Sequence, residues 1–276
     1  MSVIQRLGRI DNRIIYTLLI LVLVYPLARP IGLPISVSEY TRNSYEVIDS
    51  LQAGDVVLFD VAYSVAGAGD VEPQALAVTR HLFSKGVKII FVAYVVEGPQ
   101  IVEMNLLSVP EAEGKVYGED YVNLGYLAGR ETAIATYARG LKQAFPLDSR
   151  GNPTSELALL QDIDTAGDVD LFMFFTAANS DMYVRQITPY NVPIIGGLIN
   201  AIAPQAEPYV HAGQLDGILI GLRGGAEYET QMGRPGVGVA SMDAQSMGHL
   251  LFIGFILFAN LAYFTTRGRG GKGAAR

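Results

Sequence analysis

The sequence contains no cysteine and no tryptophan, and it has only three histidines. Without cysteine the chain forms no disulfide, no thiolate metal site and no cysteine nucleophile. His81, His211 and His249 are scattered, and no His-Glu-x-x-His pattern joins any two of them. We therefore expect no metal and no cofactor, and a domain that depends on its apolar core for stability.

The common phosphate-binding and nucleophile motifs are also missing. There is no P-loop and no Gly-x-Ser-x-Gly elbow. The stretch Gly67-Ala-Gly-Asp70 has two glycines of a dinucleotide-binding loop but lacks the third, and its spacing to the next expected helix is wrong. We interpret it as a flexible turn and expect no nucleotide ligand.

Negative charge is scarce at both ends of the chain and abundant between them. Residues 1–30 hold four cations and one anion, and residues 246–276 hold four cations and no anion. The middle has 12 cations and 26 anions, a net charge of about −14. An acidic domain of this kind repels phosphate-rich ligands, so we expect no nucleic-acid partner.

Two apolar runs lie near the ends. The first, from Ile14, reaches the roughly 20 residues that cross a bilayer when it is extended to Ile35. A cleaved signal peptide is the alternative, but Tyr25 and Pro26 stand where cleavage needs small residues, which favours an uncleaved anchor. The second run, residues 247–266, is about 20 residues long and carries no charge.

Basic residues flank both runs on the terminal side. They are Arg6, Arg9 and Arg13 before the first run, and Arg267, Arg269, Lys272 and Arg276 after the second. Short basic flanks stay in the cytoplasm, so both termini are expected there, with the middle on the periplasmic or extracellular side of the plasma (inner) membrane. The expected organisation is a basic tail at 1–13, a transmembrane helix at 14–35, an extracytoplasmic domain at 36–245, a second transmembrane helix at 247–266 and a basic tail at 267–276.

The middle domain alternates apolar, β-rich runs with amphipathic segments. The runs lie at residues 55–63, 87–96, 121–125, 170–176, 192–199 and 215–222. Nearly continuous apolar runs are typical of parallel strands that are buried on both faces. The pattern predicts an α/β domain with a doubly wound, mostly parallel, Rossmann-like sheet of about six strands.

Two of the intervening helices have clear limits in the sequence. One is expected to begin at Glu72-Pro73, because proline suits the first turn, and to stop at Gly86. Another is expected to run from Arg130 to Phe145. Residues 148–164 break the alternation, and we interpret them as a surface crossover, with a partner-contact loop as the alternative.

Ligands of open α/β sheets bind beyond the carboxyl ends of the strands. Six polar residues at these positions are candidate ligand-binding residues: Asp60, Glu97, Asn179, Asp181, Asn200 and Arg223. Asp60 stands inside an apolar strand, where a carboxylate must be compensated. Its alternative role is a structural acid that accepts backbone N–H groups from the following loop.

Two of the candidates have further interpretations. Arg223 is expected to form a structural ion pair, with Asp60 as a possible partner, and binding of an anionic ligand is the alternative. Asp181, together with Ser180, is also interpreted as a helix cap.

Asn260 and Gly254 lie in the second apolar run. A carboxamide in hydrocarbon usually bonds to a neighbouring helix, which contributes about 1 kcal/mol, and small residues allow close approach. We expect these residues to support helix association within the chain or between subunits. The alternative is that Asn260 reaches the inner interface alone.

Two segments, Tyr117–Tyr126 and Gly213–Tyr228, resemble parts of uncharacterised bacterial two-span membrane proteins with one extracytoplasmic α/β domain. The resemblance covers most of the chain and implies only this architecture. It implies no activity and no functional residue.

Three functions remain open. Only about 13 residues precede the first run and about 10 follow the second, so we expect no cytoplasmic output domain. We expect a membrane-anchored scaffold or accessory subunit that assembles with itself or with other membrane proteins in the lipid bilayer. The alternatives are a small-ligand-binding receptor subunit that signals through a partner chain, and a membrane-tethered hydrolase, for which no motif names a catalytic residue.

Overall fold

The computed structural model describes residues 11–270 and divides the chain into two compact units. One unit is an α/β domain from Pro34 to Gly238. The other combines the described residues up to Leu33 with those from Val239 onward. The domain therefore starts close to the predicted residue 36 but ends before the predicted residue 245, because the last helix begins earlier than its apolar stretch.

The domain is built on one six-stranded sheet in which all strand pairs are parallel. The strands are β1 (Val56–Ala62), β2 (Lys88–Ala93), β3 (Tyr121–Tyr126), β4 (Leu171–Thr176), β5 (Ile194–Leu198) and β6 (Gly217–Ile220). Their order is β3-β2-β1-β4-β5-β6, so the direction of winding reverses between β1 and β4. This order confirms the predicted Rossmann-like α/β fold. Five strands lie within their predicted runs, and β3 extends one residue beyond its run, to Tyr126.

Strand β1 lies at the centre and shows why the strand sequences are so apolar. All seven of its residues are buried. Leu58 and Ala62 belong to the apolar cluster on one face of the sheet, whereas Phe59 and Val61 belong to the cluster on the other. A strand covered on both faces has no solvent side, which removes the usual alternation of polar and apolar residues.

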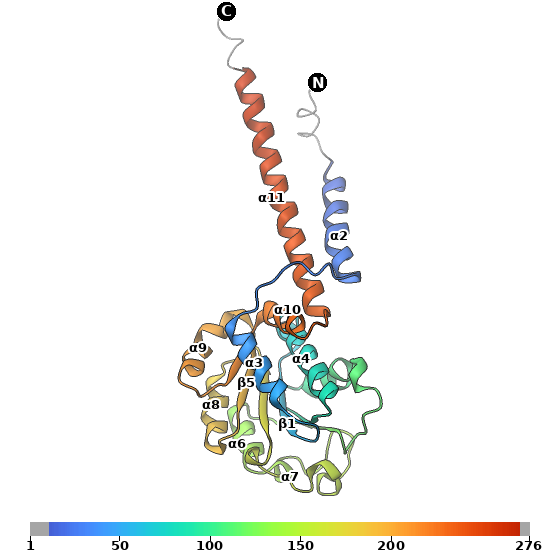
Figure 1. Ribbon diagram of the computed structural model, residues 1–276, viewed down its shortest axis with the longest axis vertical. Helices are drawn as coiled ribbons and strands as arrows, with labels where there is room; N and C mark the ends of the chain where they lie inside the picture. Colours follow the sequence, from blue (N-terminus) through green and yellow to red (C-terminus); the bar gives the residue numbers. More distant parts are fainter. Residues whose placement is uncertain (1–10, 271–276) are drawn as a thin grey trace, which may run out of the picture. The chain divides into compact units, whose positions relative to one another are not determined.

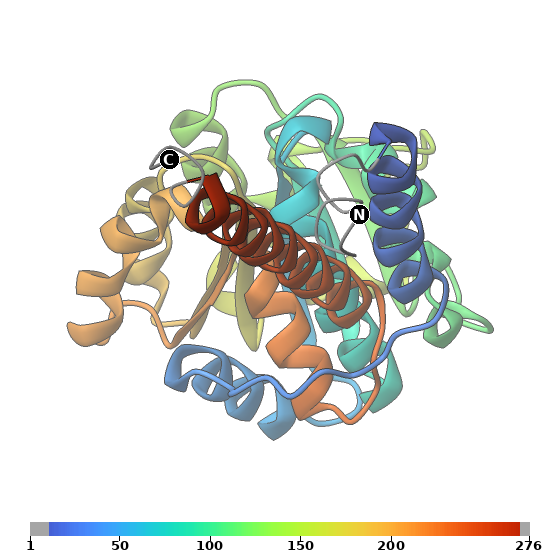
Figure 2. The ribbon, with the colours of Figure 1, turned by 90° about the horizontal axis from the view of Figure 1, so that it is seen from above.

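Helices cover both faces of the sheet (Figures 1 and 2). On one face lie α3 (Glu39–Ser50), α4 (Val65–Lys85), α5 (Gly98–Met104) and α10 (Gly221–Gln231), and on the other lie α6 (Glu131–Arg139), α7 (Leu141–Ala144), α8 (Asp181–Ile187) and α9 (Ala203–His211). Single-turn 3₁₀ segments occur at Leu106–Ser108, Pro110–Ala112, Thr154–Glu156, Ala158–Leu160, Ala166–Asp168, Thr188–Tyr190 and Asn200–Ile202.

Helix α4 begins at Val65, so the predicted start at Glu72-Pro73 is wrong. Pro73 stands inside the helix and is buried. A Cβ on Gly225 of α10 would lie 3.1 Å from the Pro73 Cβ, so the two helices meet closely at this point. Packing against α10 therefore compensates for the loss of the backbone hydrogen bond that an internal proline cannot make. The interpretation of Gly67–Asp70 as a flexible turn is also wrong, since these residues form the first turns of α4.

The predicted helix from Arg130 to Phe145 is divided at Gly140, which has an extended backbone with φ −170°. Asp164 explains the break. Its backbone oxygen accepts the amide of Leu141 at 2.6 Å, and its Oδ1 accepts the amide of Lys142 at 3.0 Å. The start of α7 is thus bonded to the 148–164 segment instead of to the preceding helical turn.

Asp148, which is only 6% exposed, fixes the beginning of the 148–164 segment through its hydrogen bonds. Its carboxylate accepts the amides of Arg150 and Asn152 at 2.9 and 2.8 Å and the hydroxyl of Tyr117 at 2.8 Å. The Arg150 guanidinium lies 3.6 Å from the centre of the Tyr117 ring. The segment is therefore a packed crossover at its start, and its role as a partner-contact loop stays a prediction.

The second unit contains α2 (Asn12–Ala28) and α11 (Val237–Gly270). Within the described residues, one stretch, Val237–Leu261 of α11, is long and apolar enough to cross a membrane, and α2 is a shorter apolar helix. Helix α2 ends at Ala28 although the predicted span continues to residue 35, and α11 begins ten residues before the predicted 247. Most of the predicted basic tails, including Arg6, Arg9, Lys272 and Arg276, lies outside the described residues.

Asp243 joins the two helical parts of this unit. Its carboxylate is 2% exposed and accepts the amides of Ile31, Gly32 and Leu33 at 2.7, 2.8 and 3.0 Å. The segment after α2 is not helical, and Asp243 satisfies three of its backbone donors. One acidic side chain of α11 therefore fixes the path of the chain after α2.

Candidate functional site

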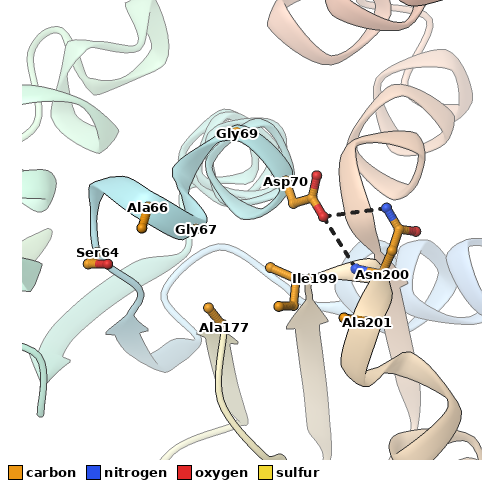
Figure 3. A pocket seen from close by; sticks show the side chains of 9 residues that line it. All are labelled: Ser64, Ala66, Gly67, Gly69, Asp70, Ala177, Ile199, Asn200 and Ala201. Atoms are coloured by element: carbon orange, nitrogen blue, oxygen red, sulfur yellow. Dashed lines mark hydrogen bonds between the residues drawn. The ribbon is translucent and has the colours of Figure 1, made fainter.

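A cavity of about 570 Å³ opens at the carboxyl ends of β1, β4 and β5. Figure 3 shows the side chains around it. The lining residues are Ser64, Ala66, Gly67, Gly69, Asp70, Ala177, Ile199, Asn200 and Ala201. Open α/β sheets bind ligands at this edge, next to the point where the strand order reverses.

The first turn of α4 forms one wall of this cavity. Ser64 is the residue before the helix, and its hydroxyl does not cap the helix amides. A Cβ on Gly67 would lie 2.9 Å from the Cβ of Ala177, which follows β4. Glycine at position 67 therefore lets the start of α4 approach the loop after β4 closely.

Two polar residues of the cavity, Asp70 and Asn200, are hydrogen-bonded to each other at one side of it (Figure 3). The Asp70 carboxylate accepts the Asn200 backbone amide at 3.3 Å and its side-chain amide at 3.4 Å (Figure 3). The Asn200 side chain also lies against Gly221, whose φ of 58° and missing side chain make room for it at the start of α10. Within residues 11–270 no ion pair to Asp70 occurs, and its carboxylate is partly exposed.

A second cavity, of about 310 Å³, lies at the beginnings of α6 and α8. It brings together Asn179 and Asp181, two of the predicted residues. Asp181 pairs with Arg185 at 2.6 Å, and Arg185 also pairs with Glu131 of α6 at 2.9 Å. Hydrogen bonds from Arg185 hold the pKa of Glu131 at about 2. Ser180 occupies the cap position of α8, but its side chain makes no capping hydrogen bond. Asp181 lies inside the first turn, and its carboxylate pairs with Arg185, so the structure shows neither residue capping the helix.

Arg130, which lines this second cavity, has an unusual backbone conformation. Its φ is 50°, a value that non-glycine residues rarely adopt, and Gly129 before it has a φ of 128°. Arg130 lines the cavity and is exposed. No hydrogen bond or ion pair to its guanidinium occurs in the described part of the chain.

Asp60 lies below the carboxyl edge and lines neither cavity. It is 0% exposed, and its Oδ2 accepts the hydroxyls of Tyr137 at 2.7 Å and Tyr183 at 3.1 Å. Burial raises the pKa of Asp60 to about 7, although both hydroxyls act in the opposite direction. The expectation that it accepts loop amides is wrong, because tyrosine hydroxyls occupy this position.

Glu97 and Arg223 are separated from both cavities. Glu97 is exposed at the start of α5. The Arg223 Nε donates to Glu227 at 2.6 Å, one turn further along α10. The predicted structural ion pair of Arg223 therefore exists, but its partner is Glu227 and not Asp60. The six candidates form no single site, and their role as ligand contacts stays a prediction.

Two buried acids on α10 were not predicted from the sequence. Glu227 is 2% exposed and binds Ser38 and Thr41 at the start of α3. Glu229 is also 2% exposed and accepts the amides of Gly236 and Gly238 at 2.8 and 2.9 Å. The two carboxylates thereby hold the first and last segments of the domain to the same helix.

Comparisons with known proteins add little to this geometry. No protein-family model matches the chain. A search of curated proteins also finds no match. Among solved structures, the crystal structure of AibC is similar over 80% of this chain, with 15% sequence identity and a TM-score of 0.33. The chain spans about half of AibC, 54% of its length. The resemblance to bacterial two-span membrane proteins stays an expectation.

Proposed function

We propose that this chain is a membrane-anchored scaffold or accessory subunit that assembles with a second copy of itself through its apolar helices. Exposed apolar side chains on α2 and α11 support this proposal. Eight large apolar residues of α2 and nine between Leu250 and Phe264 of α11 are exposed. Such a surface requires lipid or protein around it, since soluble domains seldom expose so large an apolar area.

The two apolar helices differ in length relative to the thickness of a bilayer. The stretch Val237–Leu261 is 25 residues long and extends for ~37 Å, more than the ~30 Å of hydrocarbon in a bilayer. Helix α2 has 17 residues, the lower limit for a span. We propose that both helices cross the membrane, with both termini in the cytoplasm and the acidic domain outside, as the basic flanks indicate.

The observation that favours assembly is Asn260, an exposed carboxamide on the apolar part of α11. Its amide nitrogen donates to the carbonyl of Ile256 at 2.9 Å on the same helix. The Oδ1 atom has no partner among the described residues. A donor on a second helix would satisfy this oxygen, and such bonds contribute about 1 kcal/mol in a membrane.

The test is the size of the detergent-solubilised chain, measured by light scattering after size exclusion. We expect an assembly larger than one 29.8 kDa chain. Asn260→Leu should weaken it about fivefold, as the loss of about 1 kcal/mol requires, whereas Asn260→Gln keeps the amide and should preserve it. A wild-type chain that is monomeric at all concentrations would refute self-assembly.

Topology is tested separately. Protease added to sealed, right-side-out cells should digest the domain and leave the helices intact. A domain that is protected in intact cells and cleaved only after lysis would contradict the proposed orientation.

The 570 Å³ cavity favours a second candidate function, the binding of a small ligand by the domain. Its volume is in the range of small-molecule sites. The test is a thermal-shift screen of the full-length chain with Ala201→Leu as a variant that fills the cavity. A compound that raises the melting temperature of the wild type and not of the variant would support this function, and equal shifts would place its binding elsewhere.

A further inference from the structure

Asp60 is a buried acid whose hydrogen bonds all reach one of its two oxygens. Tyr137 of α6 and Tyr183 of α8 both donate to Oδ2. Oδ1 is buried and has no hydrogen-bond partner in the described structure. An ionised carboxylate would therefore hold an uncompensated oxygen in an apolar interior, a costly arrangement that protonation relieves.

The immediate neighbours of Asp60 on the sheet carry no positive charge. Its neighbours in register on β2 and β4 are Val92 and Phe174, both apolar. The titratable groups that face it are the Tyr137 hydroxyl from α6, the Tyr183 hydroxyl from α8 and, through its electrostatic effect, Tyr94 at the end of β2. Thr176 of β4 bonds to Tyr94 at 3.2 Å, and Arg130 at the start of α6 acts on Tyr94. No ion pair to Asp60 occurs within residues 11–270.

The two tyrosines connect Asp60 to the packing of two helices. Tyr137 and Tyr183 are both 0% exposed. The Tyr183 ring stacks on Phe174 of β4, with their centres 4.1 Å apart. Helices α6 and α8 also pack against each other, and the second cavity lies at their beginnings. Asp60 is fully buried, and the two side chains that bond to it come from α6 and α8, so hydration of the carboxyl group requires the packing around these tyrosines to open.

We propose that Asp60 is a proton-binding site, and that loss of its proton loosens the packing of α6 and α8 on the sheet. Burial raises the pKa of Asp60 from 3.8 to about 7. An acid whose pKa is raised in the folded state stabilises the fold fully below the pKa of the unfolded state, and this contribution is lost as the pH rises to the folded pKa. The sensitive window therefore runs from about pH 4 to about pH 7.

Hydrogen exchange of the full-length chain in detergent tests the proposal. The protection of α6 and α8 amides, corrected for intrinsic exchange, should fall about a hundredfold between pH 5 and pH 8, tenfold for each pH unit up to about 7. Asp60→Asn keeps an acceptor and carries no proton to lose, so its protection should be constant over this range. Asp162→Asn, which changes an exposed carboxyl, should behave like the wild type.

A second variant keeps the proposal testable if Asp60→Asn does not fold. Tyr183→Phe removes one of the two donors that stabilise the ionised form, so the midpoint should move to higher pH. The infrared C=O band of the protonated carboxyl should follow the same midpoint and be absent in Asp60→Asn. The proposal is overturned if the wild type loses this band by pH 5, or if Asp60→Asn has the pH dependence of the wild type.

Discussion

Replacing Glu227 by glutamine should destabilise the domain strongly, because this residue joins its first and last helices. The Oε2 atom accepts the Ser38 amide at 3.0 Å, the Ser38 hydroxyl at 2.6 Å and the Thr41 hydroxyl at 2.7 Å. Oε1 accepts Arg223 at 2.6 Å. Glutamine has only one acceptor oxygen, and its NH₂ group would face donors at the other position.

The magnitude follows from which of these bonds are buried. The Arg223 side chain is 55% exposed, so its ion pair contributes little to stability. The bonds to Ser38 and Thr41 are charge-assisted and lie in or at the edge of the core, and such bonds contribute about 1.5–3 kcal/mol each. Because one oxygen still accepts in the variant, we expect Glu227→Gln to lower the free energy of unfolding by about 3 kcal/mol.

Urea unfolding of the full-length chain in detergent, followed by the near-ultraviolet circular dichroism of its 15 tyrosines, measures this loss. Glu39→Gln, an exposed change in the first turn of the same α3 helix, is the control and should stay within about 0.5 kcal/mol of the wild type. Equal stability of Glu227→Gln and wild type, with the same dependence on urea, would refute the assignment of this carboxylate as the connection between α3 and α10.

The effect should also depend on pH. Burial alone raises the pKa of Glu227, but hydrogen bonds from Ser38, Thr41 and Arg223 outweigh it and hold the pKa below the usual value of 4.5. An acid with a lowered pKa stabilises the fold above the pKa of the unfolded state, and this contribution is lost as the pH falls through the folded pKa. The difference between wild type and Glu227→Gln should therefore shrink below about pH 4.5.

Three further substitutions test close contacts of glycines and the hydrogen bonds of Asp243. Gly98→Ala should lower the free energy of unfolding by about 1–3 kcal/mol, because its Cβ would lie 2.6 Å from the Val61 carbonyl oxygen and would clash with Ala93. Gly69→Ala lies in the first turns of α4, where the added Cβ meets no neighbour, and should raise the free energy of unfolding by about 0.5–1 kcal/mol in the same assay. Asp243→Asn should speed hydrogen exchange at residues 31–33 at least tenfold, since one charge-assisted bond is worth about 1.5 kcal/mol or more. Unchanged exchange at these amides would show that the carboxylate does not hold them.

The strands were predictable because each is buried on both faces. A run such as that of β4, with six buried residues and three phenylalanines, has no other simple interpretation. Helix limits were less predictable where tertiary contacts override local signals. Pro73 indicated a helix start, but its packing against Gly225 keeps it inside α4. Asp164 ends the preceding helix at Gly140 through bonds that no local pattern reveals.

The candidate site was predictable only as a region of the sheet. The carboxyl-edge rule placed Asn200 beside one cavity and Asn179 with Asp181 beside another, yet it could not separate the two. Asp70 was missed as a cavity residue because its stretch was judged as a dinucleotide loop or a turn. Glu227 was missed for a different reason. Its neighbours on α10 give no sign of burial, and its partner Ser38 is 189 residues away in the chain.

The hydrogen bonds between Ser38 and Glu227 bring the first and last helices of the domain next to each other. A domain with adjacent ends can be inserted into a loop, or cut out of one, without rearranging its sheet. A circular permutant of residues 34–238, with the old ends joined by a short linker and new ends opened at the exposed Gly151, should therefore retain all six strands in their present order.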